Sequence, residues 1–197
     1  MSQPIPTTPL WHFDRGKPFY PLIMNYLVLL FGFKEFAVRG TIGPRDISPN
    51  ALEKDLAKIL GPLELRCEFQ KEHIIADADE IAQEIANNSN YVASSLLHSA
   101  GVLLILAHEI SKDRSYHAKG PLWEFLRHCR NAAAHQGAFN LVNGEPRRLA
   151  EWRGFRIDAS LNRTPLFKNE KGVGFISPGD PIGLLWDIEQ AYPNMSF

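Results

Sequence analysis

The stretch PLWEFLRHCRNAAAHQG, residues 121–137, carries the clearest structural signal in this chain of 197 residues. At about 100° per residue, its apolar side chains fall within roughly 120° of a helical wheel, the width of a face buried in a core. Pro121 suits the first turn of a helix and Gly137 suits the position just after its end. The pattern therefore predicts one amphipathic helix. Its core face comprises Leu122, Phe125, Leu126, Cys129, Ala132 and Ala133.

The polar side chains of this helix are predicted to lie on the face opposite the core. Asn131 and His135 are one turn apart, so they face the same way. Arg130 lies on another part of the polar arc, but its long side chain can swing toward the end of the helix. Ala134 also lies on this face, and its small side chain lets another backbone or an RNA strand approach the helix closely. The other polar members of this face are Glu124, Arg127 and His128.

Helical spacing of apolar residues also recurs on the N-terminal side of this stretch. Residues 21–38 are apolar on nearly every face, which predicts a central, buried helix. A cap at Ser48, followed by proline, predicts a second helix that ends near residue 61. A long helix is predicted from 77 to 110, with a break in the asparagine-rich segment 87–90.

Beyond residue 138, glycine and proline become frequent and the apolar residues lose helical spacing. Two strands, at 152–157 and 173–176, and a short helix at 181–191 are predicted there. The fold class is therefore mainly α, with a small irregular or mixed α/β C-terminal extension. Three parts are expected: an irregular arm at 1–18, a helical domain at 19–138 and an extension at 139–197 that packs on it.

The composition is that of a soluble globular protein, with 45% apolar residues, 22% charged residues and a formal net charge of −1. This balance excludes a whole-molecule basic field, so any contact with nucleic acid must come from a local patch. The longest apolar run, at 19–33, is shorter than the ~20 residues that a membrane span needs. The first nine residues lack the apolar segment of a signal peptide. We therefore expect a cytoplasmic protein with no membrane partner.

The chain lacks the motifs of common metal and cofactor sites. HExxH, CxxC, P-loop and GxGxxG motifs are absent, and two cysteines, Cys67 and Cys129, are too few for a zinc site of cysteines alone. His128 and His135 are seven residues apart, about 10.5 Å along a helix, which is too far for two ligands of one zinc ion. We expect neither a metal nor a cofactor.

A short basic run with interleaved aromatic residues follows the helix. It has two interpretations. It could form an edge that contacts RNA, with cations for phosphates and aromatic rings for bases. The other interpretation, which we favour, is a solvated loop and strand with a half-buried tryptophan. Its members are Arg147, Arg148, Trp152, Arg153, Phe155 and Arg156.

The segment RNAAAH at 130–135 resembles the R-polar-x-x-x-H signature of the HEPN superfamily, the higher eukaryotes and prokaryotes nucleotide-binding domains. The resemblance covers about residues 20–138 and implies a helical bundle. Many HEPN domains are metal-independent ribonucleases. In that case His135 would act as acid or base on the RNA 2′-OH or the leaving 5′-oxygen, Arg130 would neutralise the scissile phosphate, and Asn131 would hold His135 or a phosphate oxygen.

The same resemblance implies further partners and leaves alternatives open. HEPN domains usually form homodimers in which two signatures meet in one cleft, and those of toxin or phage-defence type can have a protein inhibitor, an antitoxin. Further RNA contacts would come from Arg127 and His128 on the helix and from Arg147, Arg148 and Arg153 beyond it. Other HEPN domains serve only in binding or assembly. A regulator that binds a small molecule or nucleotide is a third alternative.

Overall fold

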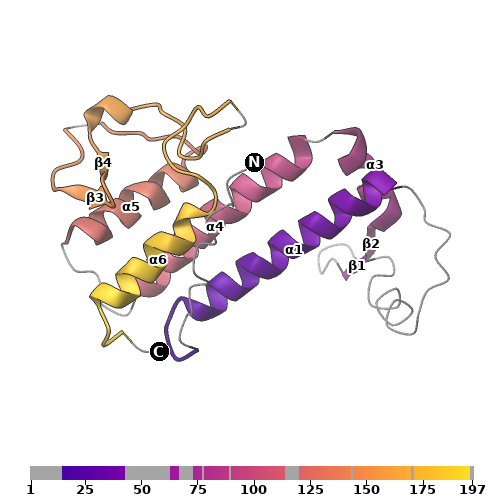
Figure 1. Ribbon diagram of the computed structural model, residues 1–197, viewed down its shortest axis with the longest axis horizontal. Coiled ribbons are helices and arrows are strands. Elements are labelled where there is room, and N and C mark those ends of the chain that lie inside the picture. Colours follow the sequence, from indigo (N-terminus) through magenta and orange to yellow (C-terminus); the bar gives the residue numbers. More distant parts are fainter. Residues whose placement is uncertain are drawn as a thin grey trace, which may run out of the picture. The chain divides into compact units, whose positions relative to one another are not determined.

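The computed structural model describes residues 15–42, 63–66, 73–76, 78–88, 90–113, 120–142, 144–169 and 171–195. The mainly α fold class is confirmed (Figure 1). The predicted helix after Ser48 and most of the predicted N-terminal arm lie outside the described residues. The helices are α1 (Tyr20–Ile42), α3 (Ala78–Asn87), α4 (Asn90–Asp113), α5 (Pro121–Ala134) and α6 (Asp180–Ala191).

The chain forms two compact units whose boundaries differ from the predicted ones. One unit combines Met1–Leu27 with Leu97–Phe197, and the other comprises Val28–Leu96. The predicted division at residue 138 falls inside the first unit, because the segment that follows α5 folds back and packs on that helix. α5 and the C-terminal extension therefore form one folded body rather than a domain and an appendage.

The predicted strand at 152–157 is a β-hairpin in the first unit. Strands β3 (Ala150–Trp152) and β4 (Phe155–Ile157) are antiparallel, with Ala150 opposite Ile157. The two residues between them, Arg153 and Gly154, have φ angles of 45° and 82°. Two consecutive positive φ angles are what a two-residue hairpin turn requires, and glycine adopts them without steric cost. The glycine therefore turns the predicted strand into a hairpin.

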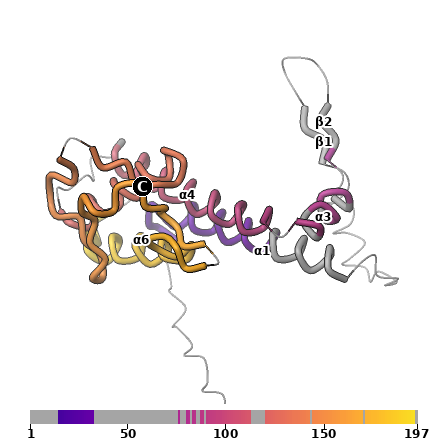
Figure 2. Tube along the Cα trace, turned by 90° about the horizontal axis from the view of Figure 1, so that it is seen from above, coloured from indigo at the N-terminus to yellow at the C-terminus, as the bar shows by residue number. Residues whose placement is uncertain are grey.

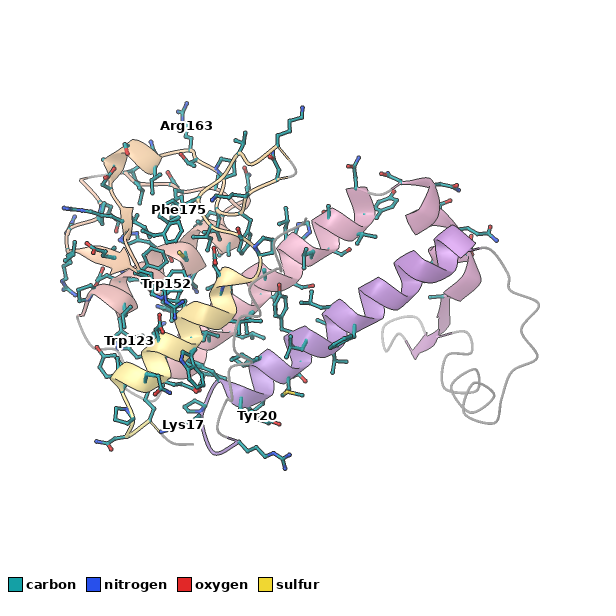
Figure 3. All side chains as sticks on the ribbon, in the orientation of Figure 1. Lys17, Tyr20, Trp123, Trp152, Arg163 and Phe175 are labelled. Carbon is teal, nitrogen blue, oxygen red and sulfur yellow. The ribbon has the colours of Figure 1, made fainter. Side chains whose placement is uncertain are left out.

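A cluster of aromatic rings holds this hairpin and the following loop against α5. The Phe175 ring lies 5.9 Å from Phe125 of α5, 5.6 Å from Phe155 of β4 and 5.4 Å from Phe139, between ring centroids. Trp152 of β3 lies 5.8 Å from Phe125. Figure 3 shows Trp152 and Phe175 on the side of α5 that carries the hairpin. The predicted strand at 173–176 is only an isolated bridge, at Ile176, because Gly172 and Gly174 interrupt it.

α6 and the start of α1 complete the first unit. α6 confirms the predicted C-terminal helix and contacts α5. The backbone N–H of Phe19 donates to Glu189 of α6 at 3.2 Å, and the Tyr26 hydroxyl donates to the Pro178 carbonyl at 2.9 Å. Figure 2 shows the chain from α5 to α6, in orange and yellow, gathered around the C-terminal part of α4. Residues far apart in the sequence thus share one core.

The second unit contains a hairpin that the sequence analysis missed. Strands β1 (Leu63–Arg66) and β2 (His73–Ala76) are antiparallel, with Leu63 opposite Ala76 (Figure 1). The predicted break between two helices is confirmed, because α3 ends at Asn87 and α4 begins at Asn90. The side chain of Asn88 accepts a hydrogen bond from the backbone N–H of Asn90 at 3.2 Å, which satisfies a donor at the start of α4.

The apolar helices are less buried than predicted. Ile23 and Tyr26 of α1 are buried, but Phe31 is 65% exposed, so the prediction of a helix buried on nearly every face is wrong. Because α1 is apolar all round, packing on one face leaves apolar side chains outside. Among the described residues, α4 is the one helix that is long and apolar enough to cross a membrane by length and composition. Four of its residues lie in the core: Ala100, Leu103, Leu104 and Ala107.

Candidate functional site

The C-terminal end of α5 positions two of the predicted catalytic residues, Asn131 and His135. The helix ends at Ala134 because the residues after His135, Gln136 and Gly137, have φ angles of 60° and 72°. His135 is therefore the C-cap of α5. Its backbone N–H still donates to the Asn131 carbonyl at 3.0 Å, and its side chain is exposed. The backbone thus fixes the imidazole at the tip of the helix.

A pocket of about 160 Å³ brings Asn131 and His135 together. This placement agrees with their predicted position on one side of the helix. One wall is α5, and the other is the chain that leaves the helix. The lining residues are His128, Asn131, Ala132, His135, Phe139, Asn140, Leu141 and Glu145.

Backbone pairing holds the second wall of this pocket in place. The N–H of Phe139 donates to the Thr164 carbonyl at 3.0 Å, and the N–H of Arg163 donates to the Phe139 carbonyl at 2.7 Å. The N–H of Leu141 donates to the side chain of Asn162 at 2.9 Å. The wall therefore depends on a loop more than twenty residues further along the chain.

A wider, open groove of about 630 Å³ begins at the same histidine. Across it from α5 lies Arg163, whose φ of 69° is unusual for a residue with a side chain. Figure 3 shows its side chain extending outward from the loop. The groove therefore offers a cation beside the exposed imidazole. Its lining residues are Ala134, His135, Gln136, Ala138, Phe139, Asn140 and Arg163.

Arg130 lies at this site but is more constrained than predicted. Its Nη2 donates to Glu109 of α4 at 2.5 Å, and its Nη1 donates to the Asn131 side chain at 3.2 Å. Its Nε is buried and makes no hydrogen bond with the described residues. The hydrogen bond from Arg130 holds the pKa of Glu109 below its ordinary value. Neither hollow that contains His135 is lined by Arg130, so Asn131 is its link to the pocket.

Two side chains that were predicted on the exposed face of α5 are buried. Glu124 is 7% exposed and His128 is 2% exposed. Arg127 donates to Glu124 from Nε at 3.1 Å and from Nη2 at 2.8 Å, and Arg148 donates to it at 3.1 Å. The prediction that His128 faces solvent is wrong, because the C-terminal extension covers this part of the helix, and its contact with RNA stays a prediction. Arg127, predicted to contact RNA, is held between Glu124 and Glu145.

Burial of His128 predicts a loss of stability in mild acid. Burial first, and then the charge of Arg127, lower the pKa of His128 below its ordinary value of 6.5. The unfolded chain then binds a proton at higher pH than the folded chain, so the free energy of unfolding should fall as the pH falls below about 6.5. Urea unfolding at pH 7.5 and 5.5 measures this difference. His128→Gln, which has no such titration, should reduce it, and an unchanged pH dependence in that variant would contradict the assignment.

The basic run after α5 does not gather at the pocket. Arg153 donates to both carboxylate oxygens of Asp187 of α6, at 2.6 and 2.9 Å, and lies over the Trp152 ring. Arg148 is 51% exposed and pairs with Glu124, while Arg147 is exposed. None of these three arginines lines either hollow that contains His135. Arg153 thus ties the β3–β4 hairpin to α6 within the extension, and Arg148 ties the extension to α5.

Several residues at the site escaped the sequence analysis. No motif marks Glu109, and its contact with Arg130 spans 21 residues. Phe139, Asn140, Glu145 and Arg163 lie in irregular segments, where no period or motif marks them. Polar and aromatic residues are frequent in the sequence shortly after the helix, but this composition does not predict which of them contact one another.

Within the described ranges, no group of three or more His, Cys, Asp and Glu residues is placed to hold a metal ion. Comparison of the chain with family models, with curated proteins and with solved structures gave no match.

Proposed function

We propose that this protein is a metal-independent RNA endonuclease of HEPN type that cleaves through the RNA 2′-OH. The observation that carries the proposal is that Asn131 and the exposed His135 line one pocket, while Arg130 is hydrogen-bonded to the Asn131 side chain. These are the three residues of the R-polar-x-x-x-H segment. An imidazole open to solvent beside a guanidinium suits proton transfer next to a phosphate.

In the proposed reaction the 2′-oxygen of the RNA attacks the neighbouring phosphorus while a base removes the 2′-proton. The P–O5′ bond breaks, and an acid protonates the leaving 5′-oxygen. His135 supplies one of these proton transfers. Arg130 neutralises the phosphate. To do so, its guanidinium releases the Glu109 carboxylate and donates its hydrogen bonds to phosphate oxygens. Until RNA binds, Glu109 keeps the guanidinium in place beside Asn131.

The chemistry predicts cleavage that resists chelation. RNA incubated with the purified protein in EDTA should be cut, and the products should carry a 2′,3′-cyclic phosphate and a 5′-hydroxyl, because the nucleophile belongs to the RNA. End-group analysis by mass spectrometry and by kinase labelling of the new 5′ ends checks this outcome. Cleavage that stops in EDTA and returns with added Mg²⁺ or Mn²⁺ would contradict the mechanism.

We propose that the active form is a homodimer. One protomer supplies one exposed histidine at the site, whereas the reaction needs both an acid and a base. On α4, Val102 and Leu106 are exposed apolar residues one turn apart, on the helix that also carries Glu109. Such side chains suit contact with a second copy.

The dimer predicts complementation between two inactive variants. Light scattering should give twice the protomer mass, and mixing Arg130→Ala with His135→Ala subunits should restore part of the cleavage that each variant lacks. A monomer that cleaves RNA at the full rate would contradict the shared cleft.

A binding or assembly module is the second candidate, favoured by one observation. Arg130 is already paired with Glu109 at 2.5 Å and does not line the pocket. If the protein is such a module, the wild-type protein and the His135→Ala variant should bind the partner with the same affinity. The cellular role, a toxin or phage-defence protein in the cytoplasm with a protein inhibitor, rests on the resemblance. Expression of wild type beside His135→Ala tests it, since only wild type should arrest growth.

A further inference from the structure

The pocket beside His135 has more polar chemistry than cleavage of a phosphodiester needs. Its volume of about 160 Å³ corresponds to roughly five water molecules at ~30 Å³ each, which is room for one small planar ring. Drug-sized ligands occupy pockets of about 300–1,000 Å³. Phe139, Leu141 and Ala132 supply apolar walls, and the remaining lining residues are polar.

One polar group of this pocket is a histidine whose tautomer the surrounding contacts define. Nη2 of Arg127 lies 2.8 Å from Nε2 of His128. A guanidinium only donates, so Nε2 must accept and the proton of the neutral ring is on Nδ1. The lowered pKa of His128 agrees with a neutral ring. Nδ1–H is therefore the hydrogen-bond donor that His128 can offer to a ligand of the pocket that it lines.

The pocket also contains a carboxylate that can accept hydrogen bonds. Oε1 of Glu145 lies 3.5 Å from Nη1 of Arg127, so the other carboxylate oxygen is left for a donor. Asn131 uses its side-chain oxygen to accept from Arg130, which leaves its NH₂ group as a donor. A ligand of this pocket must therefore be planar, must donate to a carboxylate and must accept from imidazole and amide N–H groups.

We propose that this pocket takes the base of the nucleotide next to the scissile phosphate, and that it selects bases with an exocyclic amino group. Adenine, cytosine and guanine each offer Glu145 an exocyclic NH₂ group beside ring or carbonyl acceptors, whereas uracil offers a carboxylate only its ring N3–H. The proposal rests on the proposed nuclease function. With a base in the pocket, its phosphates lie at the mouth, where His135 belongs to both the pocket and the open groove with Arg163.

The test measures binding and cleavage separately on the full chain. Adenosine, cytidine, guanosine and uridine 3′-monophosphates are titrated into wild type, Glu145→Gln and the control Glu151→Gln by calorimetry. Wild type and the control should bind the three amino-bearing nucleotides at least about tenfold more tightly than the uridine nucleotide, a difference of ~1.4 kcal/mol. Glu145→Gln should reduce this ratio to about twofold, because an amide donates as well as accepts. If Glu145→Gln does not fold, Asn140→Ala is titrated in its place. Asn140 is an exposed residue of the pocket wall, and its replacement should weaken the binding of the amino-bearing nucleotides.

The second arm uses short RNAs that differ only in the base at one position beside the cleavage site. Cleavage should be slowest with uracil there for wild type and Glu151→Gln, and should lose that dependence in Glu145→Gln. Cleavage with no base dependence, or equal binding of all four nucleotides, would overturn the pocket assignment and leave the nuclease. Selective nucleotide binding without cleavage of any RNA would instead overturn the nuclease function and leave a nucleotide site.

Discussion

Replacing His135 by alanine should lower RNA cleavage by roughly 100- to 10,000-fold, the contribution that a positioned acid or base makes. The melting temperature should stay within about a degree of wild type. The side chain is exposed, and the hydrogen bond that closes the helix comes from the backbone of this residue. The expected change in the free energy of unfolding is within ~0.5 kcal/mol, as for an ordinary surface site. Cleavage of a labelled RNA and thermal unfolding of the same preparation measure the two effects.

The control is Glu151→Ala, which removes an exposed side chain that lines neither hollow at the site. It should cleave RNA like wild type. If His135→Ala retained full cleavage, the segment 130–135 would have no catalytic role here. Arg130→Ala is a less clean test, because it also removes a contact with Glu109 and leaves that carboxylate without its closest cation.

Replacing Phe125 by alanine should cost ~3–5 kcal/mol of stability through lost burial and a cavity. The ring is fully buried and lies 5.8 Å from Trp152 and 5.9 Å from Phe175, so it joins α5 to the hairpin and to the C-terminal loop. For a domain of this size, each kcal/mol lowers the melting temperature by roughly 2–4 °C. The expected decrease is therefore about 6–20 °C, measured by calorimetry and by urea unfolding.

Leu149→Ala is the control for this loss, because it removes an apolar side chain that is about half exposed in the same unit. It should change stability by less than ~0.5 kcal/mol. A Phe125→Ala protein as stable as the control would mean that the aromatic cluster contributes little. Cleavage by Phe125→Ala, measured well below its melting temperature, should remain, since the ring lines neither hollow at His135.

The helices were predictable because their signals are local. The proline and glycine at the ends of α5, and the apolar residues at helical spacing between them, lie within 17 residues of one another. The break before Asn90 was predictable for the same reason, since the capping side chain of Asn88 is two residues away. The β1–β2 hairpin was missed because four-residue strands are too short for an alternating pattern to be distinguished from a loop.

The sequence by itself determined that α5 is amphipathic, that Phe125 and Cys129 face the core, and that Asn131 and His135 share one side of the helix. A period of 3.6 residues is enough for each of these conclusions, because all of the partners lie on one element. Only the tertiary structure decided which polar residues of α5 stay accessible. Glu124 and His128 are buried because Arg148 and the chain around Glu145 fold back over them, and Arg130 is paired because α4 places Glu109 beside it. Such contacts join residues 18 to 24 positions apart, and a charged side chain can be buried wherever another segment brings the opposite charge.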